Sequence, residues 1–134
     1  MFFEFSITVP AATAETSRIK IPMKLTVGII HFAEFDFPAG CNNQVFTRVK
    51  QGGVQIWPRN LSGTLSGNFF PIRFNEILEI KKGETNLTLE SWAPITVFQH
   101  KIRLRIGLLQ PGELFPEVNL ADLIRSFFRL FRRR

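Results

Sequence analysis

Two carboxylates placed two residues apart are the first feature of this sequence that could support catalysis. Glu34 and Asp36 lie in the run IIHFAEFDF (29–37), where alternate side chains of a strand share one face. The strand rise separates them by about 6.6–7 Å, which overlaps the spacing of the paired carboxylates of glycosidases. A solvated strand face is the simpler interpretation, here and for Glu76 and Glu79. The sequence therefore predicts no catalytic carboxylate pair.

A nucleophile or metal site would have to combine Cys41 with His31 and His100. Cys41 is the only cysteine, and nothing in the spacing brings either histidine beside it. Zinc needs three or four converging ligands, which two isolated strand histidines do not supply. We therefore expect a protein that is not an enzyme, with no metal and no cofactor. A single cysteine also excludes an intrachain disulfide and fits a reducing compartment.

The aromatic composition gives a third candidate site. The chain has 15 Phe, 2 Trp and no Tyr, and Phe belongs in cores or in dry contacts with other chains. Trp57 and Trp92 are candidate ligand-stacking residues of a carbohydrate-binding β-sandwich module, and Phe46, Phe69 and Phe70 also lie near predicted loops. The absence of Tyr argues against this alternative, because ligand sites favour amphipathic rings.

Alternating polar and apolar residues predict the β structure that must position these groups. About eight or nine strands at roughly ten-residue spacing, with Gly and Pro turns, are typical of an all-β antiparallel β-sandwich that is jelly-roll-like. No helical pattern separates the strands, which disfavours a parallel βαβ fold. We place the β-sandwich domain at residues 1–109. Its strands are expected at 2–9, 18–26, 29–37, 44–50, 54–57, 69–74, 77–80, 86–92 and 97–108.

Three of these strands carry more specific expectations. Pro22 predicts that its strand lies at a sheet edge or contains a bulge. Strict alternation in 29–37 places His31 on the same face as Ala33 and Phe35. The last strand carries an outward basic row, which would either bind phosphates or an acidic partner or protect a sheet edge from aggregation. That row consists of Lys101, Arg103 and Arg105.

The strongest single pattern follows a connector at 110–118. The segment NLADLIRSFFRLFRRR (119–134) places its apolar side chains in one arc of roughly 160° at 100° per residue, with arginines opposite. Asn119 can cap the first turn of this C-terminal amphipathic α-helix. Five Arg and one Asp give the segment +4 of the net charge of +6. The rest of the chain is nearly balanced, so nucleic-acid binding is not expected except through these arginines.

We expect this helix to act as an arm that docks onto neighbouring subunits, either copies of the same chain or a shell or tail protein. Packing against its own body and binding to a membrane surface remain alternatives. No apolar run approaches about 18 residues, so no membrane span is expected, and the N-terminal residues lack the basic region of a signal peptide. The predicted partner-binding residues are Leu120, Leu123, Ile124, Phe127, Phe128, Phe131, Arg125, Arg129 and Arg132.

Several stretches resemble a loose group of small uncharacterised β-sandwich proteins from phages and phage-like elements. They are IIHFAEFDFPAGC, GVQIWPRN, NFFPIRFNEILEI, LTLESW and HKIRLRIGLL, within residues 17–109. The resemblance implies a virion component, such as a capsid decoration protein or a minor structural protein, found in the virion after assembly in the host cytoplasm. Its motifs are structural, so it transfers no functional residue to this chain.

Overall fold

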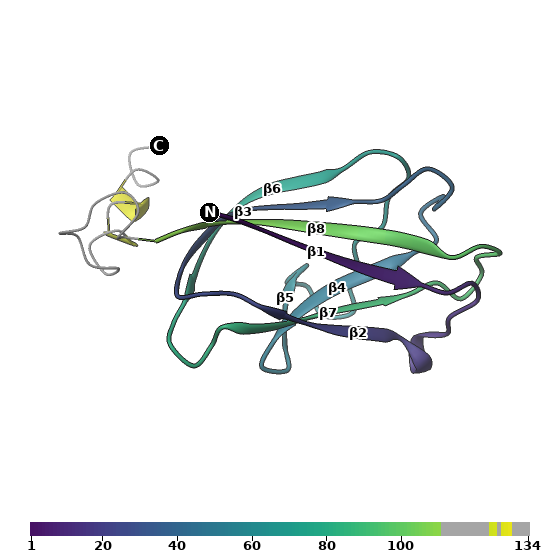
Figure 1. Cartoon of the computed structure of the whole chain (residues 1–134), viewed down its shortest axis with the longest axis horizontal. Coiled ribbons are helices and arrows are strands. Elements are labelled where there is room, and N and C mark those ends of the chain that lie inside the picture. Colours follow the sequence, from purple (N-terminus) through teal and green to yellow (C-terminus); the bar gives the residue numbers. More distant parts are fainter. Residues whose placement is uncertain (111–123, 126, 130–134) are drawn as a thin grey trace.

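The computed structural model describes residues 1–110, 124–125 and 127–129 (Figure 1). The predicted strands at 2–9, 54–57 and 86–92 are confirmed to the residue. Between the first two strands lies one turn of 3-10 helix, η1 (Glu15–Ser17). The strands are β1 (Phe2–Val9), β2 (Ile19–Lys24), β3 (Gly28–Asp36), β4 (Phe46–Gln51), β5 (Val54–Trp57), β6 (Ile72–Ile80), β7 (Asn86–Trp92) and β8 (His100–Leu109).

The strands form two antiparallel sheets, in the orders β1-β8-β3-β6 and β2-β7-β4-β5. The strands pair as β1 with β8, β2 with β7, β3 with β6 and β4 with β5. The chain therefore forms one long hairpin, and its paired strands alternate between the two sheets. This is the eight-stranded jelly roll, so the predicted fold class is confirmed. Pro22 lies in β2, at the edge of its sheet, as predicted.

The inward faces of both sheets meet in one apolar core. At the β5–β6 side, Trp57 from one sheet packs against Phe35 and Phe74 from the other, with ring centroids 6.4 Å and 5.5 Å away. The Trp57 indole Nε1 donates a hydrogen bond to a Glu76 carboxylate oxygen at 3.1 Å. The core therefore joins the two sheets through large aromatic contacts, and the one polar atom of Trp57 is satisfied.

Two expectations on the first sheet are wrong. Residues 69–74 and 77–80 do not form separate strands, because β6 runs without a break from Ile72 to Ile80. In β3 the register shifts between Ile30 and Phe32, so Ile30 joins Ala33 and Phe35 in the core in place of His31. A bulge inserts one residue and reverses the alternation beyond it, which a strict period of two cannot anticipate.

The displaced His31 explains a glycine in the neighbouring strand. A Cβ on Gly107 of β8 would lie 2.8 Å from His31 Nε2 and 3.2 Å from a ring carbon of Phe2. Burial, and then the positive charge of the N-terminus, lower the pKa of His31. The imidazole therefore packs as a neutral ring, close to a backbone without a side chain.

The basic row does not protect a sheet edge, because β8 lies between β1 and β3. Arg105 instead donates a hydrogen bond to Glu34 on the neighbouring strand, at 2.9 Å. Lys101 and Arg103 are exposed on the same outer face. This row is therefore part of a cross-strand charge pattern in the middle of a sheet.

The predicted C-terminal helix is confirmed where the structure describes it, at 124–125 and 127–129. The half-exposed Phe128 and residues Asn75, Glu76 and Ile77 of β6 line one shallow hollow of about 300 Å³. Leu120, Leu123, Phe131, Arg132 and connector residues 111–118 lie outside the described residues, and docking through this segment stays a prediction. Among the residues described, no helix is long and apolar enough to cross a membrane.

Candidate functional site

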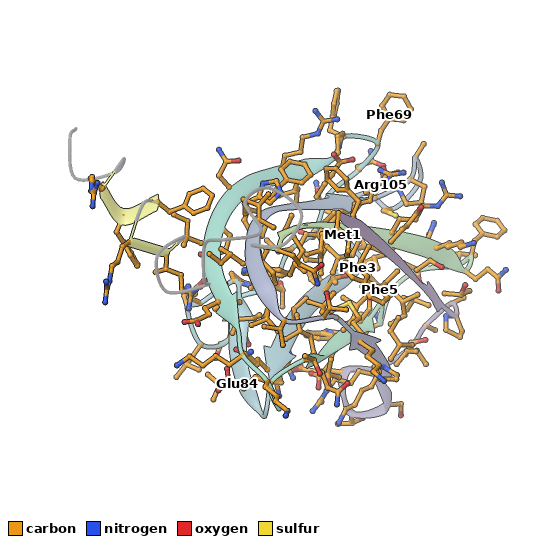
Figure 2. All side chains as sticks on the ribbon, turned by 60° about the vertical axis from the view of Figure 1, so that its left-hand side comes forward. Met1, Phe3, Phe5, Phe69, Glu84 and Arg105 are labelled. Atoms are coloured by element: carbon orange, nitrogen blue, oxygen red, sulfur yellow. The ribbon has the colours of Figure 1, made fainter. Side chains whose placement is uncertain are left out.

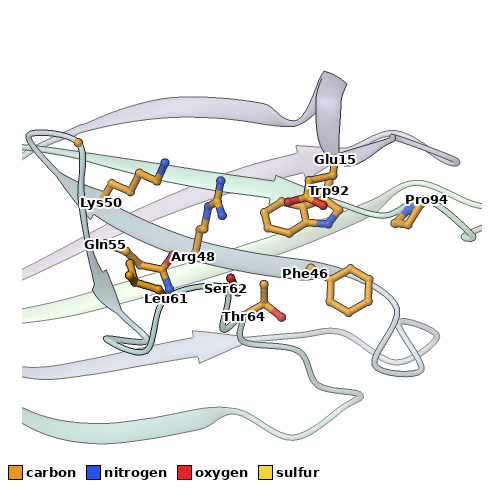
Figure 3. A pocket seen from close by; sticks show the side chains of 11 residues that line it. Glu15, Phe46, Arg48, Lys50, Gln55, Leu61, Ser62, Thr64, Trp92 and Pro94 are labelled. Carbon is orange, nitrogen blue, oxygen red and sulfur yellow. The ribbon is translucent and has the colours of Figure 1, made fainter.

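A groove of about 770 Å³ lies on the outer face of the sheet β2-β7-β4-β5 (Figure 3). Val45, Thr47 and Val49 are buried, so the alternate side chains Phe46, Arg48 and Lys50 of β4 face outward into the groove. Trp92 of β7 stands beside Phe46 at one end, with ring centroids 6.1 Å apart. The segment Leu61–Thr64 of the β5–β6 loop lines the opposite side.

The Gln55 side-chain amide helps to hold the β5–β6 loop against the sheet. The side-chain nitrogen of the buried Gln55 donates to the carbonyl oxygens of Pro58, Asn60 and Gly63, at 2.7, 3.2 and 3.1 Å. Further along the same loop, Leu65 packs against the core and forms two backbone hydrogen bonds with Thr47 of β4, at 2.9 and 2.8 Å. The wall of the groove is thus set by the preceding strand β5 and by β4.

A buried carboxylate organises the charges beside the groove. Glu90 of β7 is only 3% exposed, and four cationic side chains lie within 4.0 Å of it. Arg48 and Arg18 donate through Nε to the same oxygen at 2.8 and 3.1 Å. The ammonium groups of Lys50 and Lys20 lie 3.7 and 3.9 Å from the carboxylate. One negative charge therefore holds four positive charges in a fixed arrangement.

The surroundings of Glu90 keep it ionised. Burial alone would raise the pKa of this carboxyl, but the hydrogen bond from Arg48 and the charges of Lys50, Arg48 and Arg18 outweigh burial. The pKa of Glu90 therefore lies below its usual range. At neutral pH the cluster keeps an excess of positive charge.

Arg48 connects this charge cluster to the aromatic end of the groove. Its guanidinium carbon lies 5.0 Å from the centre of the Trp92 ring, a cation–π contact. Only Nε of Arg48 bonds to Glu90, and in the part of the chain that the structure describes its two terminal nitrogens have no hydrogen-bond partner. The planar donor pair is thus oriented by stacking and remains available to a ligand.

The two indoles that we predicted as ligand-stacking residues are both buried. Trp57 is 2% exposed and packs in the core, so it offers no face to a ligand. Trp92 is 5% exposed and reaches the groove beneath Arg48. An open stacking platform on these rings has no support in the structure. Of the three phenylalanines considered with these indoles, Phe69 and Phe70 of the β5–β6 loop are exposed and Phe46 is half-buried.

The remaining sequence candidates do not converge. Glu34 is not on a solvated face as expected, because it is 8% exposed and bonded to Arg105 and Arg73, at 2.9 and 2.8 Å. Burial, and then the charge of Asp36, raise the pKa of the buried Cys41 thiol. The described residues contain no group of three His, Cys, Asp or Glu placed to hold a metal.

Comparison with known proteins supports the fold. No protein-family model matches this chain, and no curated protein sequence matches it. A chain of the cyanophage Pam1 capsid asymmetric unit is 11% identical with a TM-score of 0.53, over 79% of this chain and 81% of that one. A CBM4 chain is 12% identical with a TM-score of 0.41, over 74% and 77%. A Tomato Aspermy Virus chain is 11% identical with a TM-score of 0.43, over 86% and 82%.

Sequence reasoning missed the groove because cross-strand pairing creates it. Phe46 pairs with Trp92, Arg48 with Glu90 and Lys50 with Thr88. Each partner lies about 40 residues further along the chain, so the cluster is invisible without the register of β4 against β7. The only local signal was the alternation of charged and apolar residues in TRVK (47–50).

Proposed function

We propose that this chain is a non-enzymatic structural protein of a virion, a capsid decoration protein or minor structural component that docks onto neighbouring subunits. The jelly-roll order of its strands and the likeness to a chain of the Pam1 capsid asymmetric unit give the proposal its direction. The observation that carries it is an apolar surface at one end of the sandwich. We call this the apolar loop surface, and it consists of Phe69, Phe70, Ile95, Val97 and Phe98.

The apolar loop surface lies at the end of the sandwich away from the N-terminus and from the end of β8 (Figure 1). Its five side chains are 65% to 79% exposed, and Phe69 points away from the body (Figure 2). Large apolar side chains gathered on an exposed surface mark an interaction site. Their concentration here therefore supports docking at this end.

Loop 37–45 connects the two apolar segments of this surface. The amide nitrogen of Phe69 donates to the carbonyl of Phe37 at 2.9 Å, and that of Gly40 to the Asn68 side chain at 3.0 Å. The segments 40–44 and 95–98 line one hollow of about 330 Å³. The three loops therefore present one preformed surface, which lowers the entropy cost of binding.

Charge favours a second copy of the chain as the partner of the apolar loop surface. The loops at this end, 10–18, 37–45, 58–71 and 93–99, contain only three charged residues: Glu15, Arg18 and Arg59. The whole chain carries +6, and the arm carries +4 of it. Two copies would therefore repel each other mainly through their arms, whereas this end allows a close, self-complementary apolar contact.

The arm at 119–134 supplies the second contact in this proposal. A single self-complementary surface makes only pairs, whereas a second, different contact extends pairs into a larger assembly. The helical residues Ile124, Phe127 and Phe128 present apolar side chains, and Arg125 and Arg129 are cationic. A groove with apolar and acidic groups on a neighbouring subunit would receive them.

Deleting residues 119–134 tests the proposal. We expect the truncated chain to stay folded, because the described core contacts all lie within residues 1–110. It should form no species larger than a pair, whereas the full chain assembles further. Sedimentation velocity measures assembly, and circular dichroism checks the fold. A folded truncated chain that assembles to the same size as the full chain contradicts the role of the arm.

A further inference from the structure

The groove on the β2-β7-β4-β5 sheet has the features of a ligand site that is separate from the proposed docking surfaces. We propose that it binds an acidic oligosaccharide, one whose sugar ring carries a carboxylate. Its volume of about 770 Å³ falls within the range of small-molecule sites. This inference does not depend on the proposed virion role.

The charge balance selects an anionic group. Arg18, Lys20, Arg48 and Lys50 face Glu90, and Glu15 lines the groove, which leaves an excess of two positive charges. The terminal nitrogens of Arg48 match the two oxygens of a carboxylate in a bidentate contact. Because Glu90 and Trp92 already hold the guanidinium, little side-chain freedom is lost on binding.

The remaining lining selects a sugar. Ser62 and Thr64 contribute hydroxyl groups that both donate and accept hydrogen bonds. The side-chain oxygen of Gln55 is a further acceptor, since only its nitrogen is used to hold the loop. At the other end, the Phe46 ring offers an apolar face beside Trp92. Hydroxyl partners, one apolar face and one fixed arginine together suit a polyhydroxylated ring with one carboxylate.

The same features disfavour nucleic acid as the ligand. Glu15 lines the groove and Glu90 lies beside it, so a chain of phosphates would meet two carboxylates. Nucleic-acid sites neutralise several phosphates with a row of basic side chains, whereas Arg48 and Lys50 are the only basic side chains among the described residues that line this groove. The excess of two positive charges around the groove matches a ligand with one or two carboxylates.

Calorimetric titration of the full chain tests the proposal with defined probes. Trigalacturonate is expected to bind with a Kd of roughly 1 mM or lower in moderate salt. Maltotriose, which has similar rings and no carboxylate, should bind at least about tenfold more weakly, since a charge-assisted hydrogen bond contributes about that factor. A tri-glutamate peptide supplies carboxylates without sugar rings and should also bind more weakly.

Charge-matched variants locate the site. Arg48→Lys keeps the charge but loses the bidentate fork, and we expect about a tenfold weaker affinity for trigalacturonate. Lys50→Gln should also weaken binding. Arg103→Gln on the other sheet and Arg129→Gln on the arm remove one charge elsewhere and should change Kd by less than about twofold. A thermal unfolding scan confirms that each variant is folded.

Four results would overturn the proposal. The first is no detectable binding of trigalacturonate at roughly 10 mM. The second and third are maltotriose or the tri-glutamate peptide binding as tightly as trigalacturonate. The fourth is an equal loss of trigalacturonate affinity in Arg129→Gln and Arg48→Lys. Equal losses in the two variants would mean that trigalacturonate binds to the arm. Equal binding of the peptide would indicate a general site for acidic proteins.

Discussion

Replacing Glu90 by Gln is expected to lower the free energy of unfolding by about 3 kcal/mol, the low end of the range for breaking a buried ion pair. Glutamine keeps the size and a hydrogen-bond acceptor but removes the charge that opposes Arg18, Lys20, Arg48 and Lys50. Lys20 and Arg18 stay partly exposed, so water solvates their charges once the carboxylate is gone. The loss of stability therefore stays near the lower limit of the range. Urea unfolding at pH 7 measures it.

The same variant should also change how stability depends on pH. Because the folded pKa of Glu90 lies below its usual value, the stabilising contribution is complete above about pH 4.3 and is lost as pH falls through the folded pKa. Glu90→Gln should remove this part of the acid sensitivity. Glu84→Gln, in an exposed turn, is the matched control and should change stability by less than about 0.5 kcal/mol. Equal stability of wild type and Glu90→Gln at pH 7 would contradict the organising role of Glu90.

Replacing Phe98 by Ser is expected to weaken self-association about 30-fold. Phe98 is 74% exposed in the apolar loop surface, and truncating a large anchor in the centre of an interface costs about 2 kcal/mol or more. The free energy of unfolding should stay nearly unchanged, because substitutions of exposed side chains change it by less than about 0.5 kcal/mol. Sedimentation equilibrium gives the dissociation constant of both chains.

Phe2→Ser is the matched control for Phe98→Ser. Phe2 has the same side chain and 70% exposure, but it lies beside His31 and Phe32 at the N-terminal end of the sandwich. We expect it to leave the association constant unchanged within about twofold. Equal losses in both variants would show that association is a general effect of surface hydrophobicity and would remove the special role of the loop end.

The strands were largely predictable because half-buried strands carry their pattern locally. Alternation in β1 and β7 reports which residues face the core, and glycine and proline mark the turns. The bulge at His31 was not predictable, since the extra residue depends on Phe2 and on the space above Gly107. A bulge of this kind depends on the neighbouring strands, so the residue pattern of one strand does not predict it.

The candidate sites were less predictable than the fold for the same reason. Trp57 and Trp92 looked like exposed loop aromatics because each ends a predicted strand, but strand ends in this jelly roll are covered by the neighbouring sheet or by Arg48. The groove requires the register of β4 against β7 and the fixed position of the loop held by Gln55. Identifying the apolar loop surface requires knowing that residues 69–70 and 95–98 lie at the same end of the sandwich.

Hydrogen–deuterium exchange of the full chain, at low and high protein concentration, tests the docking account most directly. Association through the apolar loop surface should slow exchange at high concentration in peptides that cover residues 65–71 and 93–99. Exchange on the outer face of the β2-β7-β4-β5 sheet should stay unchanged. Protection of that sheet face without the loops, or exchange that is the same at both concentrations everywhere, would contradict the account.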